Sequence, residues 1–336
     1  MKLHHFEEVV AIAERGSVRA ASRHLRIAQP ALTRSLAMLE RELGAPLFER
    51  RARGVVCTPF GQAFIARARS ILSEIRRTRE EMEQLRGAGT GTVTVGLSIA
   101  AHLALLPSSL RPFRARYPNI KLHIIEGFYP TLETRLRDGS VDFYIGPEGG
   151  AQAVPELSLE VLFQNRRVVL CRAGHPLAGA TSLRDLVGQD WVTTSITADD
   201  SAEINAFFAG HELPAPHLAV RSQSALTLLT CLANSDLLAM VPSQWQDFEM
   251  TGQALTTIKI VEELTAPALV VVRRADLPLT PAALYLLDLM RRAKSRLATP
   301  GSRPPPEPQL QNVVTAGGKA TPAGRSKAGS DQVESI

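Results

Sequence analysis

The chain has 336 residues, of which 45% are hydrophobic, 21% charged and 5% aromatic, and its formal net charge at pH 7 is +5. This composition is ordinary for a soluble globular protein, and the length favours two or three domains over one. No signal peptide is expected, because charged residues are scattered from Lys2 to Arg23. A membrane-spanning helix is not expected either, because the sequence contains no run of about 18 apolar residues. We therefore expect a cytoplasmic protein with no membrane partner, and the positive charge favours an acidic partner such as nucleic acid.

The cysteines and the paired histidines follow no metal or disulfide pattern. Cys57, Cys171 and Cys231 are odd in number and far apart, which fits neither a disulfide framework nor a zinc motif. His4 and His5 have no third ligand at a useful spacing. No metal and no cofactor are expected, and free thiols suit a reducing compartment.

The first 58 residues are predicted to form three helices and a small hairpin. Apolar residues from Leu3 to Ala13 recur at i, i+3, i+7 and i+10, as on one face of a helix. Gly16 ends that helix, and Ser17 is a suitable N-cap for a second one. Pro30 marks the start of a third helix, which carries a leucine stripe. Helices joined by such short turns are typical of a helix-turn-helix.

The third helix carries polar side chains opposite its leucine stripe and at its N-terminal flank. In a helix-turn-helix, this part of the second helix of the motif points at base edges in the major groove. Glutamine pairs well with adenine and arginine with guanine. The residues expected to read DNA are Gln29, Pro30, Thr33 and Arg34.

After the third helix, residues 47–57 are predicted to form two short strands with a cationic turn between them. That arrangement is a wing, and its arginines can neutralise phosphates. Thr58 and Pro59 then supply an N-cap and a first-turn proline for a long fourth helix. The cations expected on phosphates are Arg50, Arg51 and Arg53.

The segment from Ser17 to Gly61 resembles the LysR-type transcriptional regulators without a gap. Ala28 departs from the family, which usually has a serine or threonine cap there, and Cys57 replaces a leucine. The resemblance implies a sequence-specific regulator rather than an enzyme. Its implied partners are double-stranded DNA, a small-molecule effector, RNA polymerase and further copies of the chain. The shared residues are Ala20, Ala21, Leu25, Gln29, Pro30, Ala31, Leu32, Leu39, Glu40, Leu43, Gly44, Leu47, Phe48, Arg50, Thr58 and Gly61.

The fourth helix, over residues 59–86, has more apolar surface than a module of about sixty residues can cover. Pairing with the same helix of a second copy is one solution, and packing against its own chain is the alternative. The resemblance implies dimers that often pair into tetramers. Gly87, Gly89 and Gly91 follow, and we expect them to form a flexible hinge.

From Thr92 to residue 298, short apolar strands alternate with helical segments, which indicates a βαβ architecture. Residues 299–336 lack apolar periodicity and are rich in proline and glycine, which predicts a disordered tail. The expected strands are Val93–Leu97, Leu122–Glu126, Val141–Ile145, Val168–Cys171, Trp191–Thr194, Leu237–Val241 and Ala268–Val272, and the expected helices are Leu103–Tyr117, Leu132–Arg137 and Leu226–Ala233.

The resemblance also implies a two-lobed effector domain related in fold to periplasmic binding proteins. The chain would pass between lobes near Phe163–Arg166 and return near Thr265–Ala268. The expected fold is therefore an α+β multidomain protein. It comprises a winged helix-turn-helix (1–58), a linker and dimerisation helix with its hinge (59–91), and an α/β effector domain with lobe I (92–164 and 268–298) and lobe II (165–267).

Open parallel sheets bind ligands beyond the carboxyl ends of their strands. Ser98 begins a helix there, where free N–H groups suit an anion. The hydroxyl groups and the few charges of these loops favour a small organic or aromatic acid. The expected effector-binding residues are Ser98, Ala100, Phe128, Tyr129, Pro147, Ser195, Thr197, Ser222 and Ser224.

Two other functions stay open. A redox-sensing regulator could use Cys171 or Cys231, although both lie in apolar patterns typical of a core. A serine hydrolase could use Ser98, because Gly96–Ala100 resembles a degraded nucleophile elbow. That elbow needs several strands before it, and only helices and the wing precede it here.

Overall fold

The computed structural model describes residues 1–52, 54–87, 89–148, 156–194, 201–222, 224–247 and 254–297. The N-terminal module holds the three predicted helices, and two of their predicted ends are well formed. Gly16 ends the first helix with φ at 67°, and the Ser17 hydroxyl accepts the N–H of Ala20 at 3.1 Å. Its elements are α1 (Leu3–Arg15), α2 (Val18–Leu25), α3 (Gln29–Leu43), β1 (Phe48–Arg51) and β2 (Gly54–Cys57).

The long helix α4 (Pro59–Leu85) begins at the Thr58 cap, whose hydroxyl accepts the N–H of Gly61 at 2.9 Å. A Cβ at Gly61 would lie 1.9 Å from the Leu47 carbonyl oxygen, so only glycine allows the helix this close to the wing. Ile65 belongs to the buried core of the N-terminal module, and Ala68 is fully buried as well. Packing against its own chain therefore accounts for part of the apolar surface of α4.

The C-terminal half of α4 packs on the following domain. Hydrogen bonds join the two across the glycine segment that was predicted to be a flexible hinge. The Ser73 hydroxyl donates to the Gly139 carbonyl at 2.6 Å, and Glu80 accepts the N–H of Thr92 at 3.2 Å. Gln84 accepts the N–H of Ala282 at 3.0 Å. Three glycines of the segment have positive φ, at 83°, 56° and 126°, and reverse the chain direction. Glycine supplies a compact turn here, so the end of α4 is held against the next domain.

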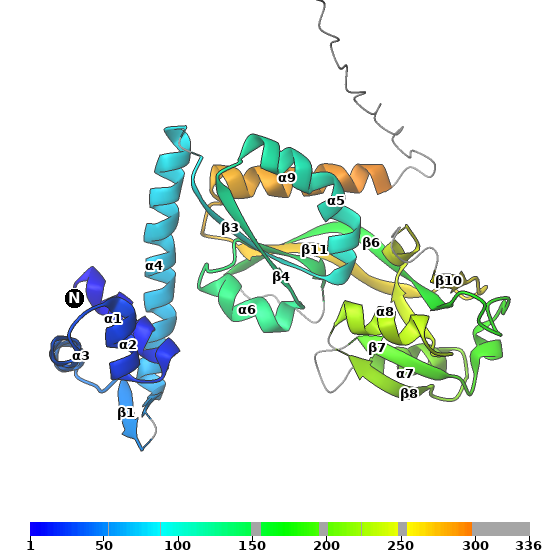
Figure 1. Ribbon diagram of the computed structural model, residues 1–336, viewed down its shortest axis with the longest axis horizontal. Coiled ribbons are helices and arrows are strands. Elements are labelled where there is room, and N and C mark those ends of the chain that lie inside the picture. The colour runs from blue at the N-terminus through cyan, green and yellow to red at the C-terminus, as the bar shows by residue number, and fades with distance from the viewer. Residues whose placement is uncertain are drawn as a thin grey trace, which may run out of the picture. The chain divides into compact units, whose positions relative to one another are not determined.

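The large domain is built on one seven-stranded sheet with the order β10-β6-β11-β5-β3-β4, and β9 pairs with β6 (Figure 1). β3 is parallel to β4 and β5, whereas β11 is antiparallel to β5 and β6. The strands are β3 (Gly91–Leu97), β4 (Ile120–Glu126), β5 (Phe143–Pro147), β6 (Leu157–Arg172), β9 (Ala239–Pro242), β10 (Leu255–Ile258) and β11 (Thr265–Arg274).

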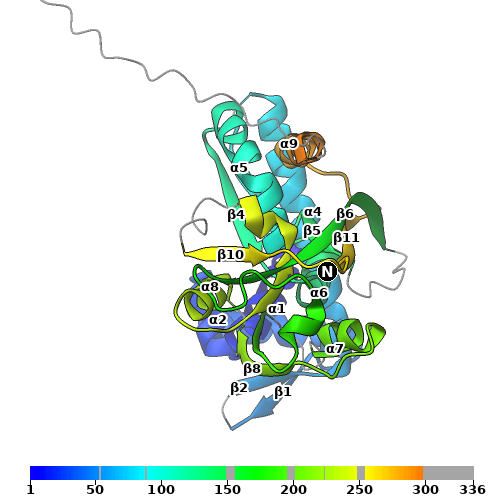
Figure 2. The ribbon, with the colours of Figure 1, turned by 90° about the vertical axis from the view of Figure 1, so that its right-hand side faces the viewer.

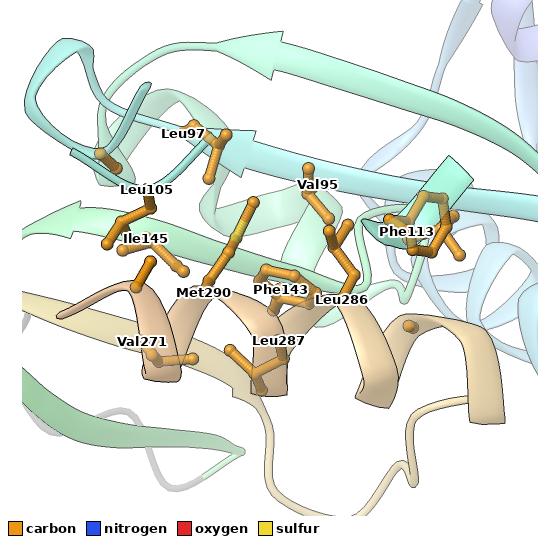
Figure 3. Packing of buried hydrophobic residues seen from close by; sticks show 14 of the residues in the cluster. Val95, Leu97, Leu105, Phe113, Phe143, Ile145, Val271, Leu286, Leu287 and Met290 are labelled. Atoms are coloured by element: carbon orange, nitrogen blue, oxygen red, sulfur yellow. The ribbon is translucent and has the colours of Figure 1, made fainter. Parts of the chain in front are cut away.

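Helices cover both faces of the lobe I half of this sheet (Figures 1 and 2). α5 (Ile99–Arg116) and α9 (Pro281–Leu297) share one face, and α6 (Tyr129–Arg137) lies on the other. In Figure 3, Leu286 and Met290 of α9 point at Val95 and Phe143, and all four side chains are fully buried. This core fixes the strand ends from which the loops facing lobe II emerge.

Lobe II packs a second, two-stranded parallel sheet and two helices around the far half of β6. Trp191 is fully buried there, edge-on to Phe208 with ring centroids 5.6 Å apart. The elements are β7 (Asp190–Thr194), α7 (Ser201–Gly210), β8 (His217–Ser222), α8 (Ala225–Ala233) and the short 3-10 helices η1 (Leu183–Leu186) and η2 (Ser243–Asp247).

β6 and β11 pass through both lobes side by side. Arg166 pairs with Thr265 and Asn165 with Ala266, and the register shifts before the next pair, Phe163 with Leu269. The irregularity lies where the chain was expected to cross. No described helix is long and apolar enough to cross a membrane.

Candidate functional site

The N-terminal half of α3 presents a polar, solvent-facing surface. Gln29, Pro30 and Arg34 are exposed, and Arg34 has no ion pair within the described part of the chain. Thr33 is half-buried, and its hydroxyl donates to the Gln29 carbonyl at 3.0 Å. Leu32, on the opposite face, is fully buried. The helix is therefore anchored by its leucines and leaves its polar face free.

The start of α3 has no side-chain cap, as the sequence predicts from Ala28. Only the Ala28 carbonyl closes the first turn, by accepting the N–H groups of Ala31 at 2.9 Å and Leu32 at 3.1 Å. A missing cap costs about 1 kcal/mol. Pro30 in the first turn offsets part of that cost, because its φ is already helical.

Contacts to both neighbouring segments hold the wing. The Glu40 carboxylate of α3 accepts the N–H groups of Leu47 at 2.7 Å and Phe48 at 3.3 Å. On the other side, the N–H of Val55 donates to the Gly16 carbonyl at 2.9 Å. Glu40 is thus a positioning residue that the sequence analysis noted only as a shared position.

Two of the three predicted wing cations lie on strand β1. Arg50 and Arg51 are exposed, and Arg51 forms an ion pair with Glu49 at 2.7 Å. Arg53 lies outside the described residues. The exposed ends of these two side chains suit phosphate contacts, and a surface pair such as Arg51 with Glu49 yields readily to a new partner.

A cavity of about 320 Å³ lies between the lobes, beside the crossing of β6 and β11. Its lobe I wall is built from the segments after β3 and β4 and from the last residue of β5, as expected for an open sheet. Five predicted residues line it, namely Ser98, Ala100, Phe128, Tyr129 and Pro147.

Ser98 has two roles at this wall. It is 3% exposed, and its hydroxyl oxygen accepts the N–H of Ala101 at 3.3 Å as the N-cap of α5. No described residue takes the hydroxyl proton, which leaves it for an acceptor in the cavity. Tyr129 also has a buried hydroxyl with no partner in the described ranges, and burial raises its pKa.

Four predicted residues are not placed in the cavity. Ser222 and Ser224 are not among its lining residues, because their hydroxyls serve the start of α8. The Ser222 hydroxyl accepts the N–H of Ser224 at 3.1 Å, and the Ser224 hydroxyl accepts that of Thr227 at 3.4 Å. Ser195 and Thr197 lie outside the described residues.

The lobe II wall contains residues that the sequence analysis missed. Asn165 and Arg167 come from β6, Glu203 from α7 and Trp245 from η2. Arg167 and Glu203 form an ion pair. These side chains lie within a strand or a helix rather than after a strand end, so the strand-end rule could not find them.

Comparisons with known proteins agree on one family. Residues 3–62 match the model described as "Bacterial regulatory helix-turn-helix protein, lysR family", and residues 86–295 match "LysR substrate binding domain". The chain is 28% identical over 283 residues to the HTH-type transcriptional regulator GalR of Pseudomonas putida, covering 84% of this chain and 71% of GalR.

The fold is similar to that of CbnR, a LysR family transcriptional regulator. The TM-score is 0.63 at 19% identity, over 88% of this chain and 99% of CbnR. Full-length CbnR complexed with its target DNA gives a TM-score of 0.61 at 20% identity, over 87% of this chain and 100% of that one. The similarity therefore extends from the helix-turn-helix through both lobes.

Proposed function

Because this chain belongs to the LysR family of bacterial transcriptional regulators, we propose that α3 and the wing read its operator and that a small organic acid in the cavity between the lobes controls it. The chain is a sequence-specific DNA-binding regulator modulated by a small-molecule effector. Its partners are double-stranded DNA, that effector and further copies of itself. We place its action in the cytoplasm, where bacterial DNA lies.

Base reading falls to the N-terminal half of α3. The observation that supports it is an exposed Arg34 with no ion pair in the described residues, beside the exposed Gln29. The leucine stripe holds the helix in place, and a guanidinium without an ion pair can bind guanine without first breaking another contact. Pro30 and Thr33 shape this surface, and the wing cations Arg50, Arg51 and Arg53 bind phosphates.

Effector binding falls to the cavity. Its volume of about 320 Å³ fits a small acid. On lobe I, the Ser98 hydroxyl and the start of α5 would donate to an oxygen of the acid, and Phe128 and Tyr129 would pack on its apolar part. Ser195 and Thr197 stay in the proposal, because they follow β7 directly.

Self-association falls to α4. Large apolar side chains on one face of this helix stay exposed, at 45% for Phe60, 40% for Ile71 and 45% for Met82. Their spacing of eleven residues is close to three helical turns, so they form one stripe. We propose that the same stripe of a second copy covers it. The proposed boundaries are 1–58, 59–91, 92–298 and 299–336.

No enzymatic role is proposed for Ser98. Its oxygen caps α5, and the His102 ring lies 3.0 Å from the Ser98 carbonyl oxygen rather than from the hydroxyl. A nucleophilic serine needs a base on its hydroxyl. The redox alternative is less favoured for Cys171, because Cys171 is fully buried and burial raises its pKa. Cys231 is half-buried, so oxidant sensing by Cys231 is left to experiment.

Sequencing the DNA fragments that the purified full-length protein captures, with and without candidate organic acids, tests this function. One shared motif, with an acid that changes the footprint on it, is the expected result. Capture of fragments without any common motif would contradict base reading by α3. A shared motif whose footprint no acid alters would contradict only the effector part.

A further inference from the structure

The cavity between the lobes holds one cation and one anion. Among the described residues that line it, Arg167 and Glu203 are the charged ones. They form an ion pair with each other, so this part of the cavity wall is electrically neutral. An effector that carries a negative charge therefore meets a full positive charge in this wall only if it displaces Glu203 from Arg167.

The backbone of Arg167 is held firmly in place. Its backbone N–H donates to the Leu264 carbonyl at 2.8 Å, and it pairs with Pro242 of β9. Two residues earlier on the same strand face, Asn165 is 7% exposed and accepts the side-chain N–H of Gln244 at 3.1 Å. The strand is thus pinned where it faces the cavity, directly beyond the crossing between lobes.

The guanidinium of Arg167 has unused hydrogen-bonding capacity. Its Nε is buried and has no partner among the residues that the structure describes. A buried N–H without an acceptor costs free energy. A planar guanidinium also favours a carboxylate that engages two of its N–H groups together.

The two members of the pair differ in exposure. The Arg167 side chain is 21% exposed, whereas that of Glu203 is 55% exposed. The Glu203 side chain can rotate into solvent at little cost in free energy, whereas the more buried Arg167 side chain needs a partner where it lies. Exchange of Glu203 for another carboxylate is therefore the easier direction.

We infer that Arg167 binds the carboxylate of the effector and that Glu203 occupies Arg167 until the effector displaces it. The inference rests on the proposed function, since it names the ligand class for the same cavity: a small organic carboxylate. Arg167 belongs to lobe II and Ser98 to lobe I, so an acid with a second oxygen would join the two lobes.

The inference predicts opposite effects for the two side chains. Glu203→Gln removes the competitor and should tighten carboxylate binding about two- to fivefold, the range for a partly exposed pair. Arg167→Gln removes the binding charge and should weaken it about ten- to hundredfold. Arg166→Gln is the matched control, because this neighbouring arginine faces solvent, paired with Glu263 at 3.3 Å.

The test is isothermal titration of the full-length protein and its three variants. The probes are 4-hydroxybenzoate and 4-hydroxybutanoate, each compared with its uncharged amide. The native protein should bind at least one carboxylate more tightly than the amide. Glu203→Gln should raise that preference, Arg167→Gln should abolish it, and Arg166→Gln should leave it unchanged. A gain in Glu203→Gln cannot come from misfolding.

Equal binding of acids and amides by the native protein would overturn the inference, as would a weaker acid affinity in Glu203→Gln or an unchanged one in Arg167→Gln. Footprints of the native protein on captured DNA, taken with the same probes, distinguish a failure of this inference from a failure of the proposed function. An amide that alters the footprint would leave effector control intact and refute only the carboxylate class.

Discussion

The guanidinium of Arg77 in α4 lies 2.9 Å from the carboxylate of Asp142, which directly precedes β5, and both side chains are almost completely buried. The Asp142 carboxylate also accepts the N–H of Thr94 at 2.7 Å, and Arg77 donates to the Gly139 carbonyl at 3.0 Å. Burial lowers the pKa of Arg77 and raises the pKa of Asp142, while the Arg77 charge acts to lower the latter. The linker helix and lobe I are thus joined by a desolvated ion pair.

Breaking this pair on one side should be costly. Asp142→Ala leaves the Arg77 charge buried and unpaired, and we expect the free energy of unfolding to fall by about 3–5 kcal/mol. The double variant Arg77→Met with Asp142→Asn removes both charges at similar volume and keeps an acceptor for the N–H of Thr94, so it should lose far less. Urea unfolding measures both. Equal losses in the two variants would mean that the charges themselves do not matter.

Base reading and phosphate binding should separate in two arginine variants. Arg34→Ala is expected to weaken specific binding by about 1–3 kcal/mol and to relax preference at one base position. Arg50→Ala should weaken binding to all sequences and reduce the salt slope by about one. Fluorescence anisotropy on specific and random duplexes over a salt series distinguishes them. Equal losses on both duplexes for Arg34→Ala would refute its place in the groove.

The Ser98 hydroxyl both caps α5 and faces the cavity, and two substitutions separate these roles. Ser98→Ala should lower stability by about 1 kcal/mol through loss of the cap. Ser98→Asp retains a capping oxygen but replaces the donor with a negative charge that repels the acid, so the footprint response to an inducing acid should be lost, while burial of the charge lowers stability as well. A full response in Ser98→Asp would show that the hydroxyl does not contact the effector.

The exposed stripe on α4 predicts how the chain associates. Ile71→Asp places a charge in the middle of this stripe and should shift the full-length protein towards monomer in light scattering, because a buried unpaired charge opposes the interface. Ala66→Asp is the control, since Ala66 is exposed on a different face of α4. Dissociation by both variants, or by neither, would place the interface elsewhere.

Thiol reactivity checks the redox alternative. Burial raises the pKa of Cys171, so at pH 8 this residue should remain a thiol and react slowly with iodoacetamide. Cys57 and Cys231 are half-buried and should be modified first, as read by mass spectrometry. If peroxide switched DNA binding and Cys171→Ser or Cys231→Ser abolished this switching, oxidant sensing would be supported.

The helices of the N-terminal module were predictable because their signals are local. Gly16 and Ser17 end and cap neighbouring helices through contacts within a few residues, and Pro59 opens α4 in the same way. The two short strands and the cationic turn of the wing were predicted from the same kind of local pattern. For this part of the chain, pattern and structure agree.

The sheet was harder to predict, since tertiary pairing decides it. Only the end of β6 was expected, because Glu160, Asn165 and Arg166 interrupt its apolar pattern. Pairing with β11 keeps these residues extended. Strands β8 and β10 and the helices α7 and α9 were not predicted either.

The lobe I wall of the cavity could be predicted from the sequence, whereas the lobe II wall depends on tertiary packing. The strand-end rule reached the lobe I residues, but Arg167 and Glu203 meet only because lobe II folds around β6. The contact of α4 with lobe I had no sequence signal, since Arg77 and Asp142 are remote along the chain. That is why the glycines after α4 were expected to form a free hinge.

The polar contacts of α4 have a consequence for exchanging sensors between regulators. The last turns of this helix, from Ser73 to Gln84, bond to lobe I and so belong structurally to the sensor, whereas Ile65 belongs to the core of the DNA-binding module. A chimera joined between Gly87 and Gly91 would place a foreign lobe against Arg77, which would then lack the buried carboxylate that Asp142 supplies here. The natural splice point lies inside the helix, between Ile65 and Ser73.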